Sequence, residues 1–159
     1  MTDFKESFRQ GMQAAKTVDE DKKEIQTVFD ELNRQLYEQS EGELCIERKD
    51  FFMKGVLQNV VDVLNAKRIK KYSAIAASNP KIPEADAIEL ARWKTDRNGY
   101  PCQIDLDGEQ MYCEDKIALE NTLNELLRDP EVGAKLYKVM TQDVPINDKT
   151  DNNTEEQDD

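Results

Sequence analysis

Histidine is absent from the 159 residues of this chain. Histidine is the usual base beside a serine or cysteine nucleophile and the commonest zinc ligand, so its absence removes the commonest designs of both kinds of site. Aromatic residues are scarce, at 7% of the composition, and no apolar run reaches the length that spans a bilayer. Residues 1–5 lack the basic-then-apolar order of a signal peptide, so neither export nor membrane insertion is expected.

Cysteine is also rare, with three residues in the whole chain. An odd number without a secretory signal predicts free thiols and a cytoplasmic protein. Cys102 and Cys113 are expected to be two buried structural thiols. A disulfide, or half of a metal site, is the alternative for this pair.

Acidic residues dominate the charge, because 34 acidic side chains against 22 basic ones leave a net charge of −12. Residues 141–159 hold seven acids and one lysine, with no apolar residues at core spacing. We therefore predict a single α+β domain over 1–140 and a disordered acidic tail over 141–159, each with a net charge of −6.

The most legible pattern is an antiparallel β-meander over residues 90–113. Asn98-Gly99 and Asp107-Gly108 are dipeptides that suit two-residue hairpin turns, and the segment 100–106 between them alternates in polarity. If both turns close, the register forms four pairs, which are Trp93 with Ile104, Thr95 with Cys102, Ile104 with Met111, and Cys102 with Cys113. Strands are expected near 90–96, 102–106 and 109–113.

This register sorts the meander by polarity, which predicts a sheet with one buried face. The expected buried face collects Ala91, Trp93, Thr95, Cys102, Ile104, Leu106, Met111 and Cys113. The expected open face carries Arg92, Lys94, Gln103, Asp105, Gln110 and Tyr112, with Arg92 opposite Asp105.

Residues 1–40 are predicted to be helical, because apolar residues recur there at spacings of three and four. They are Phe4, Phe8, Met12, Ala15, Ile25, Val28, Phe29, Leu32 and Leu36. Thr17 and the acids after it resemble a helix cap, so two helices meeting there and one long helix are both open. The stripe is expected to pack on the chain's own sheet. A homodimer through the N-terminal helices, or a partner protein, is the alternative.

A short strand over 43–48 and a helix over 50–68, capped by Asp50, are expected next. The helix stripe is Phe52, Met53, Val56, Leu57, Val60, Val63 and Leu64. The basic residues Lys67, Arg68, Lys70 and Lys71 follow it. They are read as cations that complement the helix dipole, and a phosphate-binding patch is the alternative.

Residues 70–90 are ambiguous between helix and strand. Tyr72 to Ala77 fits either, and a helical turn from Pro83 is expected to feed the first meander strand near Leu90. Residues 114–139 are predicted to be helical, with an interruption at Asp129-Pro130 where a second, shorter helix begins. The apolar stripe of the first helix is Ile117, Leu119, Leu123, Leu126 and Leu127.

The strongest enzyme hypothesis is a metal-dependent nuclease that uses Asp105 with Glu114 and Lys116. The predicted register argues against it: Asp105 pairs with Gln110, so Glu114 lies about 13 Å further along the strand. Two carboxylates that share a metal must both reach within about 2.5 Å of it. Fragments of calcium-loop patterns at 96–99 and 105–109 are incomplete and are explained as turns.

We therefore identify no catalytic, cofactor-binding or metal-binding residues and expect no cofactor. The sequence favours a non-enzymatic acidic interaction protein, of the immunity, antitoxin, chaperone or inhibitor type, that binds a basic protein partner. The metal-dependent nuclease and an acidic mimic of DNA are the alternatives. Membrane association and direct nucleic-acid binding are not expected.

Overall fold

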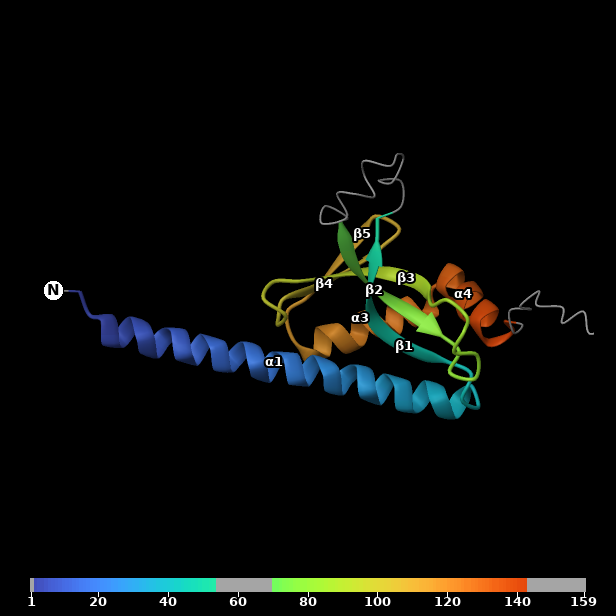
Figure 1. Ribbon diagram of the computed structural model, residues 1–159, viewed down its shortest axis with the longest axis horizontal. Helices are drawn as coiled ribbons and strands as arrows, with labels where there is room; N and C mark the ends of the chain where they lie inside the picture. Colours follow the sequence, from blue (N-terminus) through green and yellow to red (C-terminus); the bar gives the residue numbers. More distant parts are fainter. Residues whose placement is uncertain (1, 54–69, 143–159) are drawn as a thin grey trace, which may run out of the picture.

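The computed structural model describes residues 2–53 and 70–142. In this part of the chain a five-stranded antiparallel sheet, in the order β1-β2-β3-β4-β5, packs against helices (Figure 1). This confirms the α+β class. No helix within these residues combines the length and the apolar composition needed to cross a membrane.

The helix α1 runs without a break from Phe4–Gln39, so residues 1–40 form one long helix and not two. Thr17 does not cap a second helix, because its hydroxyl donates to the carbonyl of Gln13 inside α1. Asp3 is the N-cap, and its carboxylate accepts hydrogen bonds from the amides of Lys5 and Glu6.

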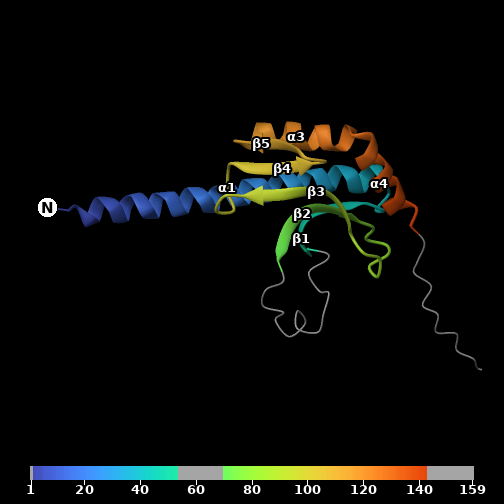
Figure 2. The same cartoon turned by 90° about the horizontal axis from the view of Figure 1, so that it is seen from above.

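Only the second half of α1 packs on the sheet, as Figure 2 shows. Ile25, Val28 and Phe29 are buried there. The expectation that the whole stripe is core was wrong for Phe4, Phe8 and Met12, which remain exposed because α1 extends beyond the edge of the sheet. Periodicity identifies the apolar face of a helix, but it does not reveal where the surface that covers this face ends.

The first strand, β1 (Cys45–Phe52), is longer than the strand expected over 43–48. Asp50 does not cap a helix: it lies in β1 opposite Ser73, whose hydroxyl donates to its carboxylate over 2.6 Å. Residues 50–52 of the expected helix over 50–68 are therefore strand, and Phe52 is exposed. The remainder of that helix, 54–68, lies outside the described residues.

The second strand, β2 (Lys71–Ser78), resolves the ambiguity of residues 70–90. It pairs with β1 along its whole length and with β3 (Ile88–Thr95) on its other side, with a bulge between Ile75 and Ala76. The expected helix from Pro83 was wrong, because the connection between β2 and β3 consists of turns held by Asn79 and Ile82.

The meander has the predicted register. Within β3, β4 (Cys102–Leu106) and β5 (Glu109–Cys113), Trp93 pairs with Ile104, Ile104 with Met111, and Cys102 with Cys113. Trp93, Cys102, Ile104 and Cys113 are buried, which confirms the predicted core face. No residue of the predicted open face is buried.

The two turns of the meander differ. Asp107 and Gly108 both have positive φ angles, of 49° and 84°, as predicted for a two-residue hairpin turn. In the first turn the positive φ angles belong to Arg97 and Asn98, so the tight bend lies one residue earlier than expected. Pairing stops at Thr95 and Cys102, and a longer connection, residues 96–101, joins the strands.

Residues 114–139 are helical as predicted, in α3 (Lys116–Arg128) and α4 (Pro130–Met140). Asp129 separates them and caps α4 through the amides of Glu131 and Val132. Ile117 was expected on the apolar stripe but is exposed, and α3 buries Leu119, Leu123 and Leu126 instead. The helix α3 packs on β4, β5 and α1, while α4 contacts β2, β3 and α3.

Candidate interaction surfaces

An acidic surface lies where α1 and α3 run beside each other. Residues 19–39 hold seven acidic side chains against three basic ones, and residues 114–129 hold five against two. Together the two segments carry a net charge of −7. The two helices contact each other directly, so these two acidic segments lie next to each other.

A groove of about 300 Å³ separates the two helices on this acidic surface. Its floor is apolar, made by Val28, Leu32 and Leu123, and its walls are polar. Glu31 of α1 and Glu120 of α3 line the walls together with Gln35 and Asn124. The groove therefore offers apolar contact at its base and negative charge at its rim.

Both rim carboxylates are exposed. Hydrogen bonds from Arg34, and then from Gln35, lower the pKa of Glu31 to about 2, so its charge persists across the physiological range. The Glu31 side chain is 51% exposed and that of Glu120 is 48% exposed. Ion pairs between exposed side chains are weak, so Glu31 and Glu120 can exchange Arg34 and Lys116 for cations of a partner.

A second surface is the part of α1 that extends beyond the sheet, residues 4–17, which we call the arm. Phe4 is 77% exposed, Phe8 is 70% exposed and Met12 is 60% exposed. These residues lie at intervals of four and therefore share one side of the helix. Exposed apolar residues that cluster in this way mark interaction sites on soluble proteins.

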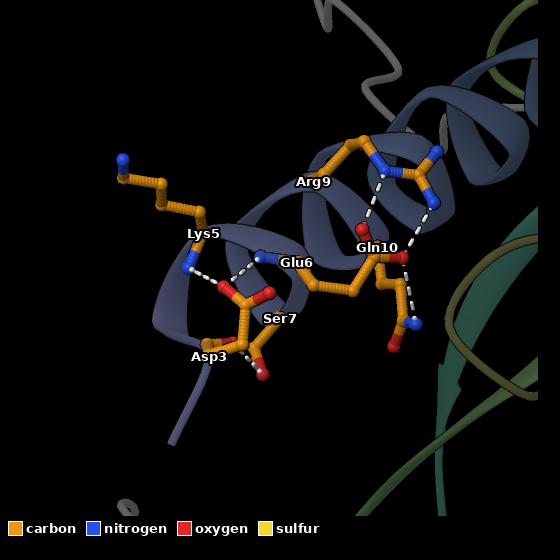
Figure 3. Close-up of polar contacts among 6 residues, drawn as sticks. All are labelled: Asp3, Lys5, Glu6, Ser7, Arg9 and Gln10. Atoms are coloured by element: carbon orange, nitrogen blue, oxygen red, sulfur yellow. Dashed lines mark hydrogen bonds and ion pairs between the residues drawn. The ribbon is translucent and has the colours of Figure 1, made fainter. Parts of the chain in front are cut away.

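The polar side chains of the arm bind one another instead (Figure 3). Arg9 donates to Glu6 through both Nε and Nη2, and Gln10 donates to Glu6 over 3.2 Å. Figure 3 also shows the backbone amides of Lys5 and Glu6 donating to Asp3. None of these hydrogen bonds covers Phe4, Phe8 or Met12, which remain exposed.

Asp105 and Lys116 of the nuclease hypothesis are engaged in separate contacts, and Glu114 is exposed between β5 and α3. Asp105 pairs with Gln110 across the hairpin, accepts a hydrogen bond from Gln103 and forms an ion pair of 3.3 Å with Lys94. Lys116 pairs with Glu120 along α3, at 3.9 Å. Within residues 2–53 and 70–142, no group of three or more cysteine or acidic side chains is arranged to hold a metal ion.

The three cysteines are free, and Cys102 and Cys113 are buried opposite each other in the sheet. The hydrogen bond with Cys113, together with burial, raises the pKa of Cys102. The thiol of Cys113 donates to the hydroxyl of Thr122 over 3.4 Å. Cys45 is half-buried. Its burial raises the pKa of the thiol, and the nearby Glu47 carboxylate raises this pKa further. The raised pKa values of Cys45 and Cys102 favour the unreactive thiol form. The hydrogen bond with Cys102 lowers the pKa of Cys113 to about 7, but Cys113 is buried and therefore shielded from reagents.

The basic cluster expected after residue 64 is described only in part. Lys67 and Arg68 lie outside the described residues. Lys70 precedes β2 and Lys71 begins it, with the Lys71 ammonium 5.4 Å from the ring centre of Phe52. The fragments that resemble calcium loops, at 96–99 and 105–109, lie in the turns of the meander, as expected.

The groove was not anticipated from the sequence. Val28, Leu32 and Leu123 were each identified as apolar stripe residues, but residues almost a hundred positions apart meet there only because α1 and α3 pack together. The sequence also gave no indication that the Asn33 side chain binds the backbone of Ile46 in β1, since a single amide on a helix produces no periodic signal. Only the acidic flanks of the two helices could have indicated this surface.

Comparison of the chain with models of protein families, with curated proteins and with solved structures finds no match. The function proposed below is therefore inferred from the shape and charge of these surfaces.

Proposed function

We propose that this chain is a non-enzymatic interaction protein that binds a basic protein partner through the acidic surface of α1 and α3. The observation that supports this most directly is the groove between the two helices, with its apolar floor and its carboxylate rim. Apolar contact supplies affinity, whereas the placement of complementary charge supplies orientation and fast association.

The groove has the form that an amphipathic helix or loop of a partner requires. Apolar side chains of the partner would lie on Val28, Leu32 and Leu123, and lysine or arginine side chains would pair with Glu31 and Glu120. Helix-in-groove recognition uses this division between a buried apolar face and a charged rim. Such a partner would meet the protein in the reducing cytoplasm, as expected for an immunity protein, antitoxin, chaperone or inhibitor.

The test is affinity capture from the native host with two matched charge-reversal variants. Glu31→Lys combined with Glu120→Lys reverses the rim of the groove. Glu84→Lys combined with Asp86→Lys makes the same change in net charge in the exposed connection between β2 and β3. Proteins retained by the wild-type chain and by the second variant, but not by the first, are partners of the groove. The proposal predicts that these proteins are basic.

Two results would contradict the proposal. The first is equal capture of the same proteins by both variants, which would show that the groove does not select them. The second is cleavage of nucleic acid in the presence of Mg²⁺ or Mn²⁺ that is abolished by Asp105→Asn or Glu114→Gln. That result would instead establish the nuclease hypothesis.

A further inference from the structure

The arm carries an apolar seam that has no cover within its own chain. Its 14 residues extend for about 21 Å at the rise of an α-helix, and every residue from 7 to 17 is exposed. Val18 and Asp21 are half-buried, and Ile25 is the first buried residue of α1. Beyond the first turn, burial along α1 therefore begins at Val18. Figures 1 and 2 show the first half of α1 extending beyond the sheet.

The seam of the arm is continuous with the face of α1 that packs in the core. Positions spaced alternately by four and three run along the whole helix: Phe4, Phe8, Gly11, Ala15, Val18, Lys22, Ile25, Phe29, Leu32 and Leu36. This is the repeat of a helix that packs through one seam, and Lys22 is its single polar position. The sheet and α3 cover the seam from Ile25 onward, whereas the same seam is open on the arm.

We infer that the arm pairs with the arm of a second copy of this chain, as two antiparallel helices with Phe4 opposite Ala15 and Phe8 opposite Gly11. The inference concerns a surface separate from the groove between α1 and α3. It therefore does not depend on the function proposed above.

The side chains of the seam complement themselves in this register. Each phenylalanine of one copy faces a residue with little or no side chain on the other, so the two helices can approach closely. A Cβ atom placed on Gly11 would meet nothing within 4 Å, which leaves room there for the ring of Phe8 from the second copy. Met12 of each copy flanks the seam beside the aliphatic stem of Lys5 from the other.

The body of the molecule determines the orientation and the register. The connection between β3 and β4 lies against α1 at Asp21, where the amide of Tyr100 donates to the carboxylate. Shifting the second helix by seven residues along the first would place its Phe4 opposite Lys22. That position lies past the point where the connection between β3 and β4 already contacts α1. A parallel pair would direct the second helix along the seam into the sheet that already covers Ile25 and Phe29.

Charge favours a second copy in the antiparallel arrangement. Residues 3–17 hold three basic and two acidic side chains, so two arms repel each other little. The acidic remainder of each molecule is kept at a distance, because the two Val18 residues lie about 26 Å apart at the helical rise. That separation exceeds the screening length of about 8 Å at physiological ionic strength. A basic partner, in contrast, would find no acidic surface on the arm.

The contact is small. Two phenylalanines and one methionine from each copy, at roughly 150 Å² each, bury about 900 Å² in total. This lies at the low end of specific interfaces, where association is weak and reversible. The dimer should therefore form with a dissociation constant roughly in the micromolar range and be visible only at raised protein concentration.

Sedimentation equilibrium between about 1 and 500 µM tests the pairing. The wild-type chain should pass from its monomer mass of 18.3 kDa to twice that mass. Phe4→Ser combined with Phe8→Ser should weaken the association at least tenfold, without changing the thermal unfolding of the body. Ile117→Ser removes an exposed apolar side chain from α3 and should leave the association unchanged. A monomer at every concentration, or equal association of the double variant, would overturn the inference.

Cysteine cross-linking tests the orientation. When Phe4→Cys and Ala15→Cys proteins are mixed and oxidised with diamide, a mixed disulfide should form, because these positions are opposite each other. Ala15→Cys alone should not cross-link beyond the wild-type background, since its two copies would lie about 16 Å apart along the pair and a disulfide needs Cα atoms within about 7 Å. Cross-linking of Ala15→Cys alone would show a parallel pair and reject the antiparallel arrangement.

Discussion

The side-chain amide of Asn33 in α1 binds both backbone polar groups of Ile46 in β1. Its Nδ2 donates to the Ile46 carbonyl and its Oδ1 accepts from the Ile46 amide, each over 2.7 Å. Within the described part of the chain β1 is an edge strand, so the backbone groups on its free side face no neighbouring strand there. Asn33 therefore takes the place of one residue of a further strand and joins the long helix to the sheet.

Replacing Asn33 with alanine should lower the free energy of unfolding by about 1–3 kcal/mol, because two groups of the buried Ile46 lose their partner. Gln35→Ala is the control, since Gln35 is exposed and binds only Glu31 at the surface. It should change the free energy of unfolding by less than about 0.5 kcal/mol. Urea unfolding followed by circular dichroism measures both values, and equal values would show that the Asn33 contact is not formed.

Trp93→Ala should lower the free energy of unfolding by about 3–5 kcal/mol, as for a large aromatic side chain in a core. Trp93 is 6% exposed, and its ring meets that of Phe29 edge to face, with centroids 5.7 Å apart. A double-mutant cycle with Phe29→Ala should yield a coupling energy of about 0.5–1.5 kcal/mol. A melting curve close to that of the wild type for Trp93→Ala would contradict the register of the meander.

Gly99→Ala should destabilise the fold by about 1 kcal/mol, because an added Cβ would lie 3.2 Å from the Cβ and 3.1 Å from the Oδ2 of Asp21. Gly133→Ala should instead stabilise it by about 0.5–1 kcal/mol, since Gly133 lies inside α4 with nothing within 4 Å of the added atom. Thermal unfolding of the two variants should therefore shift in opposite directions. A stabilising effect of Gly99→Ala would mean that α1 does not approach the connection between β3 and β4 this closely.

Labelling of the native protein with iodoacetamide at pH 7 should be slow at all three cysteines. Cys102 and Cys113 are buried, and burial together with the carboxylate of Glu47 raises the pKa of Cys45. The labelling rate at Cys45 should increase only at pH values above the ordinary pKa of a thiol, because the thiolate is the reactive species. Mass spectrometry after denaturation should find three labels per chain. Fewer than three would reveal a disulfide.

Removal of residues 143–159 should slow association with a basic partner and leave the dissociation rate almost unchanged. This segment carries seven acidic side chains and one lysine, so its loss halves the net charge of the chain. Long-range attraction acts on the encounter step and weakens with salt. Stopped-flow measurements at two ionic strengths test this prediction, with unchanged thermal unfolding of the truncated chain as the control. A faster dissociation would place the segment in the bound interface.

Local chemistry in the sequence was sufficient for the meander and for the existence of the helices. The pairing of Trp93 with Ile104 and of Cys102 with Cys113 follows from two turns and from a period-two pattern that one face of the sheet must satisfy. The cap at Asp129 and the apolar stripe of α1 are equally local, because each depends on neighbours within a few residues.

Tertiary packing decided what local patterns leave open. Tyr72 lies in a strand because β1 and β3 flank its segment on both sides, and neither neighbour can be read from the segment itself. Phe8 and Phe29 share one stripe in the sequence, yet only Phe29 is buried, since the sheet ends before it reaches the arm. The groove between α1 and α3 likewise exists only because the fold brings distant residues together. The burial of a side chain depends on the surface that covers it as well as on the helix that carries it.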